Sequence, residues 1–138
     1  MPVALLAEEI SCFISEGRFV EMKAKGFSML PFIKGGEDSI VLGPVGDVQI
    51  GDILLCKTLR NGYVIHRVVD INADTLVLMG DGNIKGKECC RSEDVVAKVV
   101  RIIGRRGVIE CDSLYFRFLS FLWRVLRPVR RVLLRIVN

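Results

Sequence analysis

The 138-residue sequence lacks several features that would place it in a common class of protein. It holds no run of about 18 uncharged apolar residues, which a membrane-spanning helix needs. Its first residues have no basic region before an apolar run, so they do not resemble a secretory signal peptide. It has no CxxC pair, and its one histidine, His66, does not complete a zinc site. We therefore expect no spanning segment, no signal peptide, no metal and no cofactor.

The cysteines form an odd set without disulfide or zinc spacing, at positions 12, 56, 89, 90 and 111. Cys89 and Cys90 are neighbours, but a reactive pair would need basic groups at a known distance, and the sequence alone does not support that reading. Free thiols are typical of a reducing compartment, so we expect a cytoplasmic protein.

Acidic residues are absent from Ser113 to the end of the chain, whereas this stretch holds six arginines. The preceding residues carry 14 basic and 16 acidic side chains, a balance of −2. The net charge of +4 therefore belongs to the tail. The body is not a basic nucleic-acid surface, and no nucleic-acid partner is expected.

The tail is expected to form a cationic amphipathic helix from Leu114 to Val137, divided or kinked at Pro128. At about 100° per residue, most of its arginines fall within an arc of roughly 80°, opposite an apolar side. With Trp123 and several phenylalanines, this pattern favours an anionic membrane surface, so we expect the protein at the cytoplasmic face of the inner membrane. Two alternatives stay open: the helix packs on the body or on another subunit, or the tail inserts into the membrane.

The body suits one domain, at residues 1–112, followed by the tail at 113–138. An apolar share of 51% with 26% charged residues is globular rather than disordered. A helical period over Val3–Ser15 ends at Gly17. Short strand-like runs follow, at 19–24, 39–42, 53–57, 64–69, 75–79, 95–103 and 108–111.

The strand-like runs are separated by turn signals rather than by helices. Asn61-Gly62 between two apolar runs predicts a hairpin. Gly51-Asp52 is expected to serve structure, because an Asp in a turn can accept hydrogen bonds from its local backbone. The pattern predicts a mainly β fold, a coiled antiparallel sheet or partly open barrel with a short N-terminal helix and a C-terminal amphipathic helix.

One serine stands in an unusual turn, Lys25-Gly26-Phe27-Ser28-Met29-Leu30-Pro31-Phe32. Glycine permits backbone angles that other residues avoid, and proline fixes its own φ and favours extended geometry before it. Such a turn can hold a hydroxyl clear of the sheet. By itself the pattern is also that of an ordinary turn.

Four segments occur in a fixed order: GFSMLPFI at 26–33, GDILLC at 51–56, VIHRVV at 64–69 and MGDGN at 79–83. This series resembles the superfamily of type I signal peptidases and LexA-type self-cleaving repressors, over about residues 20–103. The resemblance implies the fold of that superfamily and a serine endopeptidase activity.

The resemblance implies that Ser28 is the nucleophile and that its backbone N–H serves the oxyanion hole. The bacterial enzymes and the repressors use a lysine base at the position of His66. The endoplasmic-reticulum and SipW-like branches have a histidine there, as this chain does, and use a Ser/His pair. Histidine suits a base because its ordinary pKa of about 6.5 lies near neutrality. On a strand, His66 would share an apolar face with Val64 and Val68, which favours the neutral imidazole.

Asp81 is the candidate that orients the imidazole. In the Ser/His branch an acid several positions further on is also used; here that position holds Lys87, and Glu88 is a possible substitute. The bacterial enzymes have a serine at the position of Gly26, so a second backbone donor would be needed for the oxyanion.

The substrate is expected to be an extended leader- or signal-type peptide that adds as a strand beside Ser28. Phe27, Met29 and Pro31 are the candidate substrate contacts. The resemblance implies cleavage after a small residue. Two alternatives remain: a peptide-binding module of the same fold with weak or no turnover, and a self-cleaving regulator.

Overall fold

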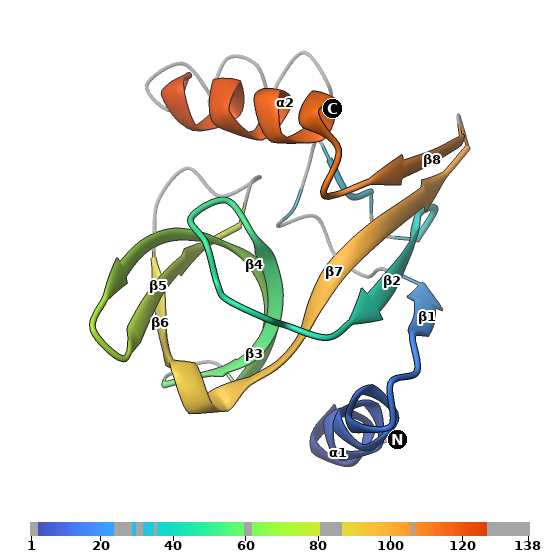
Figure 1. Ribbon diagram of the computed structural model, residues 1–138, viewed down its shortest axis with the longest axis vertical. Helices are drawn as coiled ribbons and strands as arrows, with labels where there is room; N and C mark the ends of the chain where they lie inside the picture. Colours follow the sequence, from blue (N-terminus) through green and yellow to red (C-terminus); the bar gives the residue numbers. More distant parts are fainter. Residues whose placement is uncertain are drawn as a thin grey trace.

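A computed structural model describes residues 3–23, 29, 32–34, 36–59, 62–80, 87–105 and 107–126. The chain is mainly β, with a helix near each end of the described part (Figure 1). The elements are α1 (Val3–Ser15), β1 (Val20–Lys23), β2 (Ser39–Gly43), β3 (Ile53–Thr58), β4 (Gly62–Asn72), β5 (Thr75–Met79), β6 (Glu88–Arg91), the 3₁₀ turn η1 (Ser92–Asp94), β7 (Val95–Gly104), β8 (Gly107–Glu110) and α2 (Leu114–Val125).

The strands form one antiparallel sheet in the order β1-β2-β7-β3-β4-β5-β6, with β8 paired to β7. The half of the sheet from β3 to β6 curls round on itself, while β1, β2, β7 and β8 extend away from it as a second wing (Figure 1). A backbone bond of 3.0 Å from Leu59 N to Cys89 O joins the end of β3 to β6. The sheet is therefore a half-barrel, and the mainly antiparallel β fold expected from the sequence is confirmed.

Strand β3 is buried on both faces, which explains why its sequence is almost uninterruptedly apolar. Ile53 and Leu55 belong to the larger core cluster, together with Ile10 of α1 and Phe116 of α2. The alternate residues of β3 belong to a second cluster formed by β3 to β6: Leu54, Cys56, Val68, Leu76, Leu78 and Cys90. The central strands thus separate two apolar cores.

Helix α1 has the bounds expected from the sequence, and Gly17 ends it. Gly17 adopts a φ of 80°, a left-handed conformation that glycine takes without strain. Its N–H donates to Ile14 O at 3.0 Å, and Arg18 N donates to Phe13 O at 2.9 Å. These two bonds form a Schellman motif, which satisfies carbonyls at the helix end.

The expected strands are present with small shifts at their ends, and the β3–β4 hairpin predicted from Asn61-Gly62 is confirmed by the pairing of Thr58 with Gly62. Strand β8 begins at Gly107, one residue before the expected start. Strand β6 was missed. Its sequence Glu-Cys-Cys-Arg offers no alternation of apolar and polar residues, and only its pairing with β5 makes it a strand.

Helix α2 has two apolar faces. Ser113 caps it, since its hydroxyl accepts from Phe116 N at 3.2 Å. Phe116, Ser120 and Trp123 are buried against the body, where Phe32 makes edge contacts with both aromatic rings. The face turned away from the body exposes large apolar side chains, namely Leu114, Tyr115, Phe118, Phe121, Leu122 and Val125.

Packing of α2 on the body, one of the roles that the sequence left open, is thus confirmed. The expected continuation of the helix past Val125 lies outside the described residues. Among the described residues, no helix is both long and apolar enough to cross a membrane.

Two phenylalanines of α2 test this packing. Phe116 is 2% exposed and Phe118 is 61% exposed. Phe116→Ala should lower the free energy of unfolding by about 3–5 kcal/mol, because it removes a ring from the core and leaves a cavity. Phe118→Ala should change it by no more than about 0.5 kcal/mol. Urea unfolding followed by circular dichroism measures both, and equal effects would contradict the packing of α2.

Candidate active site

Of the three catalytic residues proposed from the sequence, the described part of the chain contains His66. Ser28 and Asp81 lie outside the described residues, as do Phe27 and Pro31. The described residues that flank these positions in the chain are β1 and the residues around Phe32 for Ser28, and the end of β5 for Asp81.

His66 lies in the middle of β4, a long strand paired on both sides. It is opposite Leu54 of β3, so both side chains lie on the same face of the sheet. Val64 and Val68 alternate with it on that face and belong to the second core cluster or pack against it. His66 as a residue is 7% exposed. The apolar face expected for His66 is thus confirmed, and the paired strand fixes its backbone.

Arg67, the next residue, points to the other face and is fully buried at 0% exposure. Its Nη1 donates to Gly51 O at 2.8 Å. Its guanidinium carbon lies 5.1 Å from the ring centroid of Phe32 and 5.6 Å from that of Phe116. Cation–π contacts of this kind contribute up to about 2 kcal/mol when desolvated. Arg67 therefore joins β4, the chain after the serine turn, and α2.

The sequence neighbours of Ser28 and His66 pack in one cluster. Met29 is 5% exposed and belongs to the larger core cluster, against which Ile65 also packs. Met29, a candidate substrate contact from the sequence, is thus a member of the buried core.

Of the two candidate acids, Glu88 is among the described residues, whereas Asp81 is known only through the strand that precedes it. Strand β5, which leads toward Asp81, ends at Met79, and Met79 pairs with Arg67 beside the histidine. Glu88, the other candidate, begins β6 and pairs with Leu78 of β5. Strand β5 therefore lies between Glu88 and the strand that carries His66.

The Gly51-Asp52 turn is held by the sheet at several points. Gly51 has a φ of 102°, which favours glycine, and its N–H donates to Val68 O at 2.8 Å. Val68 N in turn donates to Asp52 O at 2.8 Å. The Asp52 carboxylate accepts from Gln49 N at 2.9 Å. The structural role expected for this motif, including a local backbone bond to its aspartate, is confirmed.

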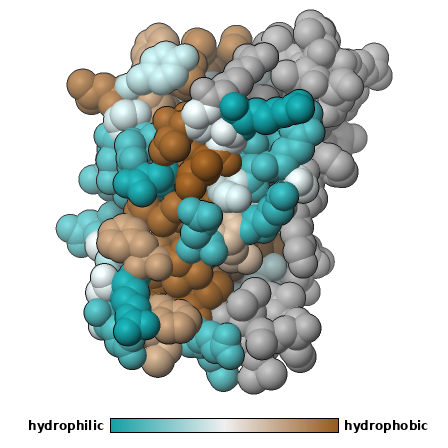
Figure 2. All heavy atoms as spheres, turned by 90° about the vertical axis from the view of Figure 1, so that its right-hand side faces the viewer, coloured by the Kyte–Doolittle hydropathy of each residue, from teal (hydrophilic) through white to brown (hydrophobic). Residues whose placement is uncertain are grey.

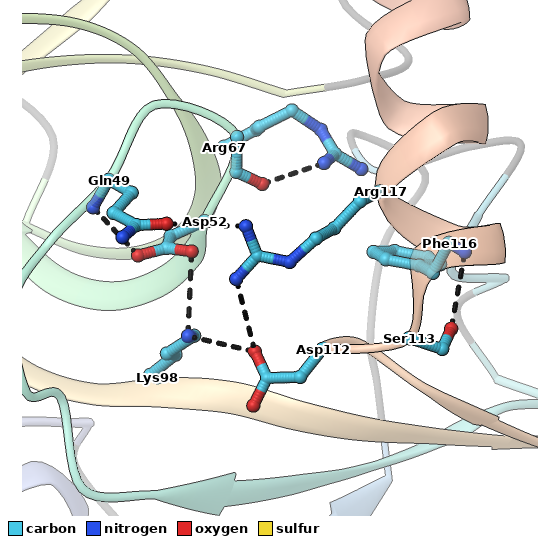
Figure 3. A network of polar contacts seen from close by, with 9 residues as sticks. Gln49, Asp52, Arg67, Lys98, Asp112, Ser113, Phe116 and Arg117 are labelled. Carbon is cyan, nitrogen blue, oxygen red and sulfur yellow. Dashed lines mark hydrogen bonds and ion pairs between the residues drawn. The ribbon is translucent and has the colours of Figure 1, made fainter.

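A polar network extends from Asp52 to α2 (Figure 3). Lys98 of β7 places its ammonium 3.5 Å from Asp52 Oδ1 and 3.2 Å from Asp112 Oδ1. Arg117 of α2 lies 3.7 Å from Asp112 Oδ1 and donates to Gln49 Oε1 at 3.2 Å. The first turn of α2 is therefore tied by charge to the turn that begins β3.

Two of the buried thiols, Cys56 and Cys111, are poorly suited to act as nucleophiles. Burial raises the pKa of Cys111 to about 12, and a hydrogen bond to Cys90, with burial, raises the pKa of Cys56 further from its ordinary value. A thiol must lose its proton to attack a carbonyl. Within the described residues, no group of three or more His, Cys, Asp or Glu side chains is arranged to hold a metal.

Two connecting residues, Arg67 and Lys98, were not predicted from the sequence. Arg67 stands inside the apolar run VIHRVV, and a charged residue within an otherwise buried strand is itself a signal of a specific buried partner. Lys98 interrupts the apolar run Val95–Ile103 in the same way. Their partners could not be read from the sequence, because they come from distant segments.

In comparisons with known proteins, no family model and no curated protein matches the chain.

Asp52 and Asp112 share one ammonium group but differ in burial, which makes them a matched pair. The Asp52 side chain is 9% exposed and that of Asp112 is 66% exposed. Asp52→Ala should cost about 3 kcal/mol of stability, because it leaves the Lys98 ammonium largely buried with less compensation. Asp112→Ala should cost less than about 1 kcal/mol. Chemical unfolding measures both losses of unfolding free energy. A larger loss for Asp112→Ala than for Asp52→Ala would contradict the prediction that the more buried carboxylate contributes more.

Proposed function

We propose that the protein is a serine endopeptidase of the signal-peptidase and LexA type, with Ser28 as nucleophile and His66 as base. The observation that carries the proposal is the shared packing around the two motifs. Met29 and Ile65, the sequence neighbours of the two residues, pack in one cluster, and Arg67 lies over Phe32. The order of the four motifs supports the same assignment.

In the proposed reaction, His66 accepts the proton of the Ser28 hydroxyl as its oxygen attacks the scissile carbonyl. The backbone N–H of Ser28 and a second donor stabilise the oxyanion. The imidazolium then gives its proton to the leaving amine. In the second half of the reaction, His66 accepts a proton from water as the water attacks the acyl group, and then returns it to the Ser28 oxygen as that oxygen leaves. Asp81, or Glu88 in its place, orients the imidazole.

The proposed substrate is an extended leader- or signal-type peptide, cleaved after a small residue. Strand β1 leads into the serine turn and ends the strand order of the described sheet. A peptide added beside it would gain backbone hydrogen bonds and would pass the nucleophile. A peptide-binding module of the same fold with weak or no turnover would use the same edge.

Active-site labelling tests the assignment. A fluorophosphonate probe should label wild type at Ser28, and Ser28→Ala should abolish this label. His66→Ala should slow it by about 10²- to 10⁴-fold, the usual contribution of a general base. Ser11→Ala is the control, since Ser11 is an exposed serine of α1, and it should label like wild type.

Labelling is followed by mass spectrometry of the digested protein. Absence of Ser28-dependent label in a folded wild type would contradict the endopeptidase. Retained binding of an extended peptide in that case would support the binding module instead. Cleavage within the chain itself, dependent on Ser28, would support the self-cleaving regulator.

We further propose that α2 docks the protein on an anionic membrane surface at the cytoplasmic side. The exposed apolar face of α2 supports this, because an interfacial helix needs such a face. Viewed from the side of β1 and β8, apolar side chains form a band that reaches the top of the molecule, where α2 lies (Figure 2). The sequence from Ser113 onward adds six arginines and no acid.

Vesicle co-sedimentation tests the docking. Wild type should bind vesicles containing an anionic lipid and should bind neutral vesicles more weakly. Phe118→Ser with Leu122→Ser should lower binding more than about tenfold, because two exposed apolar side chains are lost from the surface. Phe13→Ser, at an exposed position of α1, should leave binding unchanged. Equal absence of binding to both vesicles would leave α2 with its packing role alone.

A further inference from the structure

Arg67 is a fully buried cation directly beside the histidine that the proposed reaction uses as its base. Arg67 is 0% exposed and His66 is 7% exposed. The two follow each other in β4, so their side chains lie on opposite faces of the sheet. A guanidinium removed from water is costly, so the groups that compensate it fix its position closely.

The sheet holds Arg67 at both its backbone and its side chain. Its backbone lies between Ile53 of β3 and Met79 of β5, with which it pairs. Its Nη1 donates to Gly51 O at 2.8 Å, and Gly51 N donates to Val68 O at 2.8 Å. The guanidinium thus binds the turn that itself binds the next residue of β4, and it projects from a fixed base.

Beyond the sheet, the guanidinium contacts the chain that follows the serine turn. Its carbon lies 5.1 Å from the ring centroid of Phe32. Phe32 N donates to Met29 O at 3.1 Å, and Ile33 N donates to the same oxygen at 3.0 Å. These two bonds fix Phe32 relative to Met29, which directly follows Ser28 in the sequence.

Helix α2 holds the other sides of the Phe32 ring. The ring centroid of Phe116 lies 5.4 Å from that of Phe32, and the centroid of Trp123 lies 6.3 Å from it, both in edge contacts. The Phe116 ring also lies 5.6 Å from the guanidinium carbon. Phe32 is therefore held between a cation of β4 and two rings of α2.

We propose that Arg67 is a positioning residue of the endopeptidase. Its guanidinium holds the ring of Phe32, and with it Met29, at a fixed place relative to His66, the neighbour of Arg67 in β4. Arg67 does not touch the reacting atoms in this role. The proposal rests on the proposed function, because it assigns to the contact between Arg67 and Phe32 the placing of the Ser28 hydroxyl against the imidazole.

The proposed reaction needs such a link because its two main groups come from separate segments. A base must lie within about 2.6–3.2 Å of the group whose proton it takes. The ladder of β4 fixes His66 only, and a misplacement of about 1 Å can cost about 10²-fold in rate. Arginine suits the link, since its planar face stacks on a ring while its N–H groups bind a carbonyl.

Labelling kinetics of the full chain with the fluorophosphonate probe test the proposal. Arg67→Met keeps an apolar stem and removes the guanidinium, and its maximal labelling rate should fall about 10- to 100-fold. The probe concentration that gives half of the maximal rate should stay near the wild-type value, because Arg67 does not touch the probe. Arg67→Lys keeps the charge without the planar group, and its rate should stay closer to that of Arg67→Met than to wild type.

Phe32→Leu tests the same contact from its other side. Phe32 is only partly buried, so this variant decides if both Arg67 variants fail to fold. It removes the ring face and should also slow labelling. In the double variant Arg67→Met with Phe32→Leu, the two losses should not multiply, because both remove one contact.

Two control variants separate positioning from stability. Ile10→Ala removes a side chain that is 2% exposed in the larger core cluster, on α1 at the opposite end of the molecule from α2 (Figure 1). It should lower the Tm, and the protein that circular dichroism shows to be folded should label like wild type. Arg101→Met makes the same change at an exposed arginine of β7 and should alter neither.

The outcomes distinguish this proposal from the endopeptidase itself. A folded Arg67→Met or Phe32→Leu that labels at the wild-type rate would overturn the positioning role and leave the endopeptidase intact. Losses that multiply in the double variant would also overturn it, as would slow labelling of folded Ile10→Ala, since stability alone would then set the rate. A wild type without Ser28-dependent label would overturn the endopeptidase and the positioning role together.

Discussion

The buried guanidinium of Arg67 is the interaction on which the arrangement of the molecule most depends. A charge removed from water is costly unless its donors are satisfied, so the groups around it must be held in place. Gly51 supplies a carbonyl, and Phe32 and Phe116 supply ring faces. These partners come from the turn before β3, from the chain after the serine turn, and from α2. One side chain of β4 therefore joins the sheet and its Gly51 turn to two segments outside the sheet, the chain around Phe32 and α2.

The proposed catalytic histidine is adjacent to this arginine, and the alternation of β4 assigns the two side chains to opposite cores. His66 faces the cluster inside the curled sheet, and Arg67 faces the cluster under α2. A change in the packing of Phe116 would therefore act on the backbone of the histidine through a single peptide unit. This coupling gives α2 a place in the proposed site although it contributes no reacting group.

Helix α2 has to serve two environments. Its buried face completes the larger core through Phe116 and Trp123, and its exposed face is apolar as well. Arg117 lies at the flank between these faces, where it contacts Asp112 and Gln49. The docked helix thus directs an aromatic surface away from the body. That orientation is compatible with docking on the proposed membrane surface. The exposed side chains of this face do not take part in the core of the body.

The sequence by itself determined the local features of this protein. Gly17 ends α1, the Asn61-Gly62 pair marks the β3–β4 hairpin, and the alternation around His66 sets its apolar face, because each depends on residues close in the chain. Strand β6 and the partners of Arg67 were decided by the tertiary structure. They depend on pairings between distant segments, and no local periodicity or turn chemistry encodes which strand will close the sheet or which ring will cover a buried charge.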